Sequence, residues 1–498
     1  MDPLLLGIDI GTASTKGVLA TPQGEIVATA VRKHTMDLPR PGWAEVDAER
    51  TWWGDLVEVA RELMGGIDPT RVAAMCVSGM GPCLLVTDAE LRPVRPAILY
   101  GIDGRAEQEI AELTDRFGAE EILQRCGKAL STQAVGPKVV WLRRHEPDAW
   151  ARGARWFSSN SYVAAKLTGE YVLDHHTASQ SDPLYDVRTN TWIGEWVPDV
   201  VGDLEMPRLV TPAEVMGKVT AQAAAATGIP AGTPVSVGTV DAWAEAFSAG
   251  VRHPGDLMLM YGSTLFFVQV LERFRTHPKL WTTAGVEPGQ HTIAAGMSTS
   301  GSLTAWVQDL CGGPSFEELV REAAAVEPGS DGLLLLPYFA GERSPIFDPH
   351  ARGVVAGLTL RHGRAHLFRA AYEGIAFGIR QIIDFLEHDD DPIRRLVAVG
   401  GGTQGGLWTQ IVSDVTGRPQ EIPVQTIGAS YGDALLAGIG VGLLPPETDW
   451  ATVGSVVEPR PETREVYDAR YAAYSELYPA TRDIVHGLAA AQERAFAD

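Results

Sequence analysis

Residues 4–19, with the sequence L-L-L-G-I-D-I-G-T-A-S-T-K-G-V-L, constrain the fold of this chain more than any other segment. Two short apolar runs are separated by glycine and small hydroxyl residues, which is typical of two buried strands joined by a tight turn. Asp9 stands between two isoleucines, and a buried carboxylate is costly unless a positive group meets it. The turn offers backbone N–H groups, hydroxyls and Lys16, which suit a phosphate, and Asp9 suits the magnesium ion that accompanies phosphate. The alternative is that Asp9 only caps the turn.

Length and composition limit the class of protein. A chain of 498 residues is too long for one core, so we expect two large domains. The formal net charge of −22 argues against binding to nucleic acid or to an anionic membrane surface. The four cysteines have no metal-site spacing and are expected to be free thiols in a reducing compartment. With no basic leader at the N-terminus and no apolar run of about 18 residues, a cytoplasmic protein is expected.

The second half of the sequence repeats the opening pattern. Residues 229–234, I-P-A-G-T-P, form the best linker candidate, which places the domains at 1–233 and 234–498. A predicted strand at 235–240 leads to Asp241 and a short helix, and the strand at 256–260 is followed by Y-G-S-T and a second apolar run. This repeat predicts duplicated α/β domains, each with one phosphate turn.

A glycine-rich segment lies between a predicted strand at 396–399 and a helix. Gly400, Gly402 and Gly405 fit G-x-G-x-x-G, which by itself favours a nicotinamide dehydrogenase with Glu421 as the ribose-binding acid. The same glycines also suit the adenosine or α-phosphate of a nucleotide above a helix N-terminus. The sequence contains no P-loop and no H-E-x-x-H motif, so these two patterns suggest no other enzyme class.

Taken together, the motifs resemble those of the FGGY carbohydrate kinase family. The resemblance extends from Leu4 to about Leu444 and includes the first phosphate turn. It further includes the following segments: Gly42–Asp47 with Trp52-Trp53, Asp103-Gly104-Arg105, Gly238–Asp241, Tyr261–Thr264, Gly353–Glu373, Gly400–Gln404, Leu407-Trp408, Gln410-Ile411 and Ser413–Val415. The number and order of these motifs give the resemblance its weight.

The resemblance implies two ribonuclease H-like, actin-type ATPase domains around a central cleft that binds ATP and a sugar. It implies that Asp241 is the catalytic base and that Asp9 holds Mg²⁺. The residues expected to bind the nucleotide and its phosphates are Thr12, Ser14, Thr15, Lys16, Ser263, Thr264, Gly301, Gly400, Gly401, Gly402 and Gln404. The residues expected to face the sugar are Trp43, Glu45, Met80 and Asp103. A homodimer is possible, because dimers are common in the family.

The identity of the acceptor stays open at this point. Xylulokinases of the family carry G-Q-M-H-G beside the sugar, whereas this chain has Gly79–Cys83, so the usual histidine is missing. We expect ATP-dependent phosphorylation of a ketopentose such as xylulose or ribulose, with an alditol or hexulose as the alternative. The interpretations from other classes are the dehydrogenase and a non-catalytic, actin-like nucleotide-binding protein.

Overall fold

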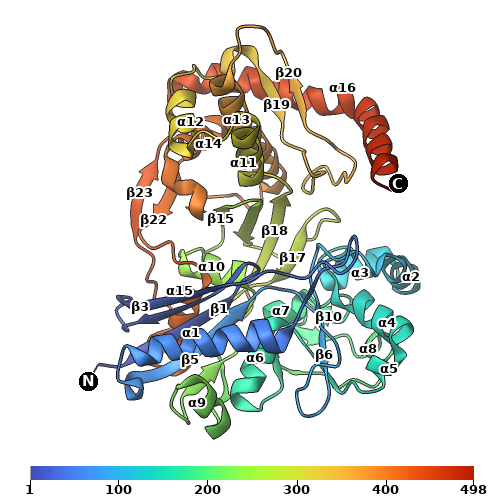
Figure 1. Ribbon diagram of the computed structural model, residues 1–498, viewed down its shortest axis with the longest axis vertical. Helices are drawn as coiled ribbons and strands as arrows, with labels where there is room; N and C mark the ends of the chain where they lie inside the picture. Colours follow the sequence, from blue (N-terminus) through green and yellow to red (C-terminus); the bar gives the residue numbers. More distant parts are fainter. Residues whose placement is uncertain (1, 498) are drawn as a thin grey trace. The chain divides into compact units, whose positions relative to one another are not determined.

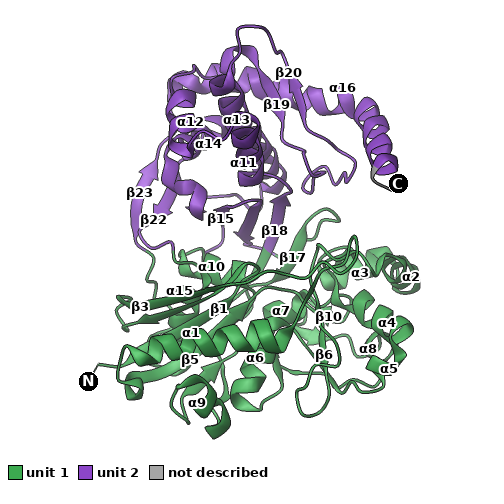
Figure 2. Cartoon of the chain, viewed as in Figure 1, with its two compact units in different colours: residues 1–252, 274–292, 427–451 green, residues 253–273, 293–426, 452–498 purple. Residues whose placement is uncertain are grey.

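The computed structural model describes residues 2–497, which form two compact units (Figures 1 and 2). Unit 1 contains the chain up to Arg252 together with Phe274–Thr292 and Ile427–Ala451. Unit 2 contains His253–Arg273, Ile293–Thr426 and the chain from Thr452. No helix among the described residues is long and apolar enough to cross a membrane.

The division differs from the boundary expected at 233/234. The strand β14 (Pro234–Ser236) pairs in parallel with β5 (Val72–Gly79), and α10 (Asp241–Ser248) follows it within unit 1. The linker segment before β14 therefore lies inside unit 1 and does not separate two bodies. The chain also returns to unit 1 near residue 427, which no local signal in the sequence indicated.

The main sheet of unit 1 has six strands in the order β13-β14-β5-β1-β2-β3. Its further strands are β13 (Val215–Lys218), β1 (Leu4–Ile10), β2 (Ser14–Ala20) and β3 (Ile26–Lys33). The predicted hairpin is present, because β1 pairs antiparallel with β2 and parallel with β5.

The two faces of β1 pack against different helices. Leu4, Leu6, Ile8 and Ile10 belong to the core that also contains residues of α1 (Gly54–Gly65). The odd-numbered residues face α15 (Ala429–Gly440), which crosses β1 closely: a Cβ atom at Gly7 would overlap the carbonyl oxygen of Ser430. Because side chains alternate along a strand, Asp9 lies on the α15 face.

Around this sheet, unit 1 is mainly helical. Its remaining α-helices are α2 (Glu107–Phe117), α3 (Ala119–Cys126), α4 (Val135–His145), α5 (Pro147–Trp150), α6 (Ser159–Thr168), α7 (His175–Ser179), α8 (Val197–Val201) and α9 (Ala221–Thr227). Its shorter strands are β4 (Glu45–Val46), β6 (Leu85–Thr87), β7 (Ala97–Ile98), β8 (Arg155–Phe157), β9 (Val172–Asp174), β10 (Tyr185–Asp186), β11 (Thr191–Trp192), β12 (Arg208–Val210) and β17 (Trp281–Ala284).

Unit 2 repeats the topology of unit 1. Its sheet contains the order β18-β16-β15-β21-β22-β23, with β15 antiparallel to β16 and parallel to β21, which is parallel to β22. The strands are β15 (Asp256–Tyr261), β16 (Leu265–Val270), β18 (His291–Met297), β21 (Arg395–Val399), β22 (Gln420–Pro423) and β23 (Val453–Val457), with a separate hairpin of β19 (Leu334–Leu336) and β20 (Val354–Ala356). The helices are α11 (Gly301–Leu310), α12 (Phe316–Ala324), α13 (Arg364–Leu386), α14 (Leu407–Thr416) and α16 (Arg464–Ala497). The expected duplication is confirmed.

Candidate active site

Three polar residues form a row across the main sheet of unit 1. Asp9 on β1 is directly opposite Lys16 on β2 and directly opposite Ser78 on β5. Residues opposite one another in a sheet project from the same face, so all three face α15. The Ser78 hydroxyl lies 3.3 Å from Asp9 Oδ1, and no ion pair within 4.0 Å joins Asp9 to Lys16 in the described chain. The row therefore pairs one buried carboxylate with one ammonium group that is still free to bind an anion.

The helix α10 adds two more carboxylates to this group. The backbone of Gly79 bonds to Thr239, which brings the start of α10 to the end of β5. Asp241 is the first residue of α10, and its Oδ1 accepts the N–H of Ala242 at 2.8 Å. Glu245 follows one turn later, on the same side of the helix.

Burial is the largest effect on the acidity of these carboxyl groups. Burial, followed by the charge of Asp241, raises the pKa of Asp9. Burial also raises the pKa of Asp241, while the N–H of Ala242 and then Lys16 oppose the rise. Burial raises the pKa of Glu245 to about 7, again against Lys16. Three buried carboxyl groups, those of Asp9, Asp241 and Glu245, thus share the positive charge of one lysine, Lys16.

The residues expected to bind phosphate at the turn between β1 and β2 do not all lie on the same face of the sheet. The Thr12 hydroxyl bonds to Tyr100 Oη at 2.7 Å, and the turn is closed by Gly11 N–H donating to Ser14 O at 3.0 Å. Thr15 is opposite Ile10 and fully buried, so it lies on the α1 face, away from Asp9 and Lys16. The expected phosphate contact of the Thr15 side chain therefore has no geometric basis, because strand alternation turns it away.

Two residues that support the turn were not expected. His34 Nε2 bonds to Gly11 O at 2.9 Å, and its Nδ1 bonds to Asp55 at 2.7 Å. This imidazole fixes the turn from the position directly after β3, a segment that the sequence motifs did not include. Tyr100 does the same from the side of Thr12.

The two acids expected to face the sugar are already occupied by arginine. Asp103 accepts from Arg105 Nη2 at 2.6 Å and from Ala44 N at 2.7 Å. Glu45 is 2.8 Å from Arg105 Nη1 and 2.5 Å from Arg95 Nη2. These carboxylates hold the fully buried guanidinium of Arg105, which leaves them fewer lone pairs for sugar hydroxyls.

Trp43 and Met80 differ in what they can contact. The Arg105 guanidinium lies 3.9 Å from the centroid of the Trp43 ring, a cation–π contact, so one face of the indole is taken. Met80 is fully buried in the core, where its N–H donates to Ile10 O and its carbonyl accepts from Ser159 Oγ. Met80 thus secures the segment after β5 and does not present its side chain at a surface.

In unit 2 a second turn, between β15 and β16, contacts two further segments. Ser300 N and Ser302 N both donate to Ser263 O, and Gly301 N donates to Gly262 O at 3.0 Å, so the start of α11 is bound to the turn. A Cβ atom at Gly400, whose φ is +92°, would meet the carbonyl of Tyr261. The structure therefore brings together in unit 2 the expected residues Ser263, Gly301, Gly400 and Gly402. Thr264 lies in the same turn, and Gly401 and Gln404 lie in the segment that follows Gly400.

The segment after β21 differs from a dinucleotide-binding turn. Residues Gly401–Gly405 form a 3₁₀ turn before α14 begins at Leu407. Glu421, the acid that a dehydrogenase would use for ribose, pairs with Arg395 at 2.6 Å. The glycine pattern here supports close packing of Gly400 and Gly402 on Tyr261, which only a residue without a side chain allows.

Four further polar residues were missed by motif analysis. They are Glu245, Ser78, Asp433 and Lys138. The spacing of four residues from Asp241 in a predicted helix was a signal for Glu245. Lys138 is fully buried and donates to Thr132 O at 2.5 Å, and burial lowers its pKa to about 8. Ser78 and Asp433 gave no signal, because the contact between them spans 355 positions of the sequence.

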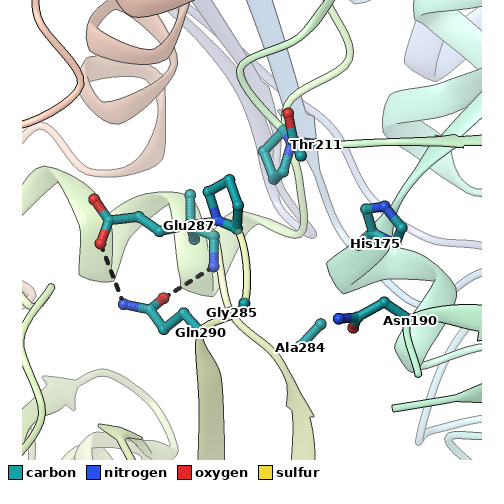
Figure 3. Close-up of a pocket in the computed structure, with 11 residues that line it drawn as sticks. His175, Asn190, Thr211, Ala284, Gly285, Glu287 and Gln290 are labelled. Atoms are coloured by element: carbon teal, nitrogen blue, oxygen red, sulfur yellow. Dashed lines mark hydrogen bonds between the residues drawn. The ribbon is translucent and has the colours of Figure 1, made fainter. Parts of the chain in front are cut away.

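A separate pocket of about 160 Å³ lies elsewhere in unit 1 (Figure 3). Its labelled lining includes His175, Asn190 and Thr211, together with the segment that contains Glu287 and Gln290. Glu287 is engaged by Arg252 and Gln290, and His175 Nδ1 bonds to Tyr185 at 2.8 Å. None of the expected site residues lines this pocket.

Comparison with known proteins identifies the class. The model of the N-terminal domain of the FGGY family of carbohydrate kinases matches residues 4–248, and that of the C-terminal domain matches residues 257–441. The chain therefore belongs to the FGGY family of carbohydrate kinases. The two ribonuclease H-like, actin-type domains are confirmed, and the interpretations as a dehydrogenase or a non-catalytic protein are wrong.

Individual relatives cover nearly the whole chain. The chain is 29% identical to the xylulose kinase of Escherichia coli (strain K12), over 95% of this chain and 96% of that protein. It is 31% identical to the glycerol kinase of Nocardia farcinica, over 87% and 89%. The crystal structure of xylulose kinase from Rhodospirillum rubrum matches with a TM-score of 0.88 and 33% identity, over 97% and 100%. The relatives thus act on more than one acceptor.

The buried acids predict a pH-dependent stability. A carboxyl whose pKa is raised on folding binds more protons in the native state than in the unfolded state, so stability falls as pH rises between the two pKa values. For Glu245 this window extends from the usual value of 4.5 to about 7, with a slope of up to ~1.4 kcal/mol per pH unit for one proton. Thermal unfolding in a chelator should therefore show a midpoint that decreases over this range.

Glu245→Gln should make the decrease of the midpoint with pH less steep, because one of the buried acids is removed. Glu447→Gln, at an exposed position of the same unit, should leave the slope unchanged. Equal slopes for the wild type and both variants would contradict the electrostatic account of Glu245.

Proposed function

We propose that this carbohydrate kinase transfers the γ-phosphoryl group of ATP to a hydroxyl of a ketopentose such as xylulose or ribulose. The main support is the position of Asp241, whose carboxylate shares the buried region of Asp9 and Lys16. The second candidate acceptor is an alditol or hexulose. It is favoured by the 31% identity to a glycerol kinase and by Gly81-Pro82, where xylulokinases of the family carry histidine.

Asp241 is the proposed general base. Its Oδ1 accepts the Ala242 N–H, and no other hydrogen bond to its carboxylate is found in residues 2–497, so Oδ2 is available to accept the proton of the acceptor hydroxyl. Its place at the N-terminus of α10 favours the ionised form, although burial opposes it. A base whose pKa lies above its usual range is better matched to proton transfer near neutral pH.

The donor set around Asp9 fits Mg²⁺. No group of three His, Cys, Asp or Glu side chains within residues 2–497 could hold a metal unaided, and Mg²⁺ is usually bound by one or two carboxylates together with substrate phosphates and water. Asp9 would hold the ion, and Lys16, Thr12 and Ser14 would bind phosphate oxygens. When bound, Mg²⁺ neutralises charge on the phosphates during transfer. A divalent cation also compensates the excess of buried acid described above.

Residues of unit 2 are the proposed nucleotide ligands. Ser263, Thr264 and Gln404 are exposed, and Gly400, Gly401 and Gly402 leave room for a ligand beside the backbone because they have no side chains. Gly301, whose N–H donates to Gly262 O, would line the site at the start of α11. Hydroxyl, amide and backbone N–H groups suit phosphate and ribose oxygens. On the acceptor side, Glu45 and Asp103 shape the site by fixing Arg105 beneath Trp43, and Met80 orders the segment that leads to Gly81-Pro82.

Loss of the base should separate catalysis from binding. Asp241→Asn should lower kcat by about 10²–10⁴-fold, because an amide cannot accept the hydroxyl proton. Binding of ADP, measured by calorimetry, should remain within a few-fold of the wild type, since Asp241 is not among the nucleotide ligands. A variant that keeps more than about a tenth of the wild-type kcat would show that another group accepts the proton.

The acceptor is tested by measuring ADP release with pentuloses, hexuloses, alditols and glycerol. We expect xylulose or ribulose to give the highest kcat/KM. Pro82→His should raise the ratio of activity on D-xylulose to that on the other acceptors, because it restores a hydrogen-bond donor at that position; a single polar contact changes discrimination by ~1–3 kcal/mol. Inert pentuloses beside an efficiently phosphorylated aldose or non-sugar alcohol would overturn the substrate class while leaving the kinase assignment intact.

A further inference from the structure

A carboxylate far along the chain reaches the row formed by Lys16, Asp9 and Ser78. Asp433 lies in the second turn of α15, in the segment that returns to unit 1, and is fully buried. In Figure 1, α15 lies beside β1 and β5, the strands that carry Asp9 and Ser78. A Cβ atom at Gly7 would meet backbone atoms of Ser430 and Ala434, so α15 has little freedom to move relative to β1. Asp433 is thereby held at a fixed height above the sheet.

Ser78 connects Asp433 to Asp9. The Ser78 N–H donates to Asp433 Oδ2 at 3.1 Å, and the Ser78 hydroxyl lies 2.6 Å from the same oxygen. That hydroxyl is also 3.3 Å from Asp9 Oδ1. Asp433 and Ser78 are fully buried and Asp9 is 6% exposed, so water does not compete for these contacts. Asp9 Oδ2 has no hydrogen bond from any described residue.

The single hydroxyl hydrogen of Ser78 limits which groups can donate and which can accept in this chain of hydrogen bonds. Ser78 has one hydroxyl hydrogen and therefore cannot donate to both carboxyl groups at once. Burial, together with the charge of Asp9, raises the pKa of Asp433 well above its usual range, and no cation within 4.0 Å of Asp433 in residues 2–497 offsets this. A neutral Asp433 donates to Ser78 Oγ, which leaves the Ser78 hydrogen for Asp9 Oδ1.

We propose that Asp433 is a positioning residue of the phosphoryl-transfer site, which fixes the orientation of the Asp9 carboxylate through Ser78. The inference rests on the proposed role of Asp9 toward Mg²⁺. With Oδ1 held by Ser78, Oδ2 of Asp9 keeps one direction in which to meet a cation. A core residue without this role would be more stable as an apolar side chain, since a buried acid without a cationic partner is costly.

The test is a double-mutant cycle read as Mg²⁺ affinity. The thermal midpoint is measured against Mg²⁺ concentration at saturating ADP for the wild type, Ser78→Ala, Asp433→Ala and the double variant. Each single variant should weaken the apparent Mg²⁺ affinity by about 10–100-fold, the usual effect of losing a partner that orients a metal ligand. The double variant should be no weaker than either single one, because both interrupt the same connection. Additive losses would overturn the proposal.

Two further variants separate positioning from stability. Asp433→Asn preserves the size of the side chain and should fold. Because the Ser78 N–H donates to the Oδ2 position, the amide oxygen should take that place, where it can only accept from the Ser78 hydroxyl, so Mg²⁺ affinity should still fall. Asp182→Asn is the matched control: this acid of unit 1 is equally buried, pairs with Lys128 at 3.1 Å and should lower the midpoint without changing the Mg²⁺ dependence. If Asp433→Asn behaves like Asp182→Asn, Asp433 is structural only. A wild-type protein without any Mg²⁺ response would instead overturn the proposed function, and this inference with it.

Discussion

The desolvation of Asp9 is the constraint on which the other features of the site depend. The residue lies in a strand buried on both faces, so its carboxylate is stable as an anion only beside a positive group. One ammonium group, that of Lys16, stabilises the Asp9 anion, whereas the charges of Asp241 and Glu245 destabilise it further. In the proposed phosphoryl-transfer site, a Mg²⁺ ion that accompanies the nucleotide would offset this imbalance.

The backbone explains how the acids are brought so close together. β1 is flanked by β2 and β5 in a register that aligns Lys16, Asp9 and Ser78, and the continuation of β5 through Thr239 delivers the start of α10. The glycine at position 7 permits the close approach of α15. Backbone hydrogen bonds and the missing side chain at Gly7 thus fix the positions of β1, β5, α10 and α15. The positions of the carboxyl groups are a consequence of this arrangement.

Local patterns in the sequence predicted the features that depend on neighbouring residues. The hairpin around Gly11 and the duplicated topology follow from short apolar runs and turn residues, and the ordered motifs indicated the family. Thr15 was expected among the phosphate ligands from its place in the motif, and the alternation of the strand turns its side chain toward α1. The return of the chain near residue 427, and with it Asp433, depends on contacts over hundreds of positions, which no local pattern encodes. Likewise, the pairing of Glu45 and Asp103 with Arg105 became evident only once the loops were folded.

The central claim is that burial raises the pKa of Asp9 and that a bound divalent cation favours its ionised form. The most direct measurement is the number of protons released when Mg²⁺ binds to the ADP-saturated protein at pH 7, obtained by calorimetry in buffers of different ionisation enthalpy. Because a metal ligand must be deprotonated, the wild type should release up to about one proton more than Asp9→Asn. Equal proton release by the two proteins would contradict the claim, since Asp9 would then be ionised before the cation arrives.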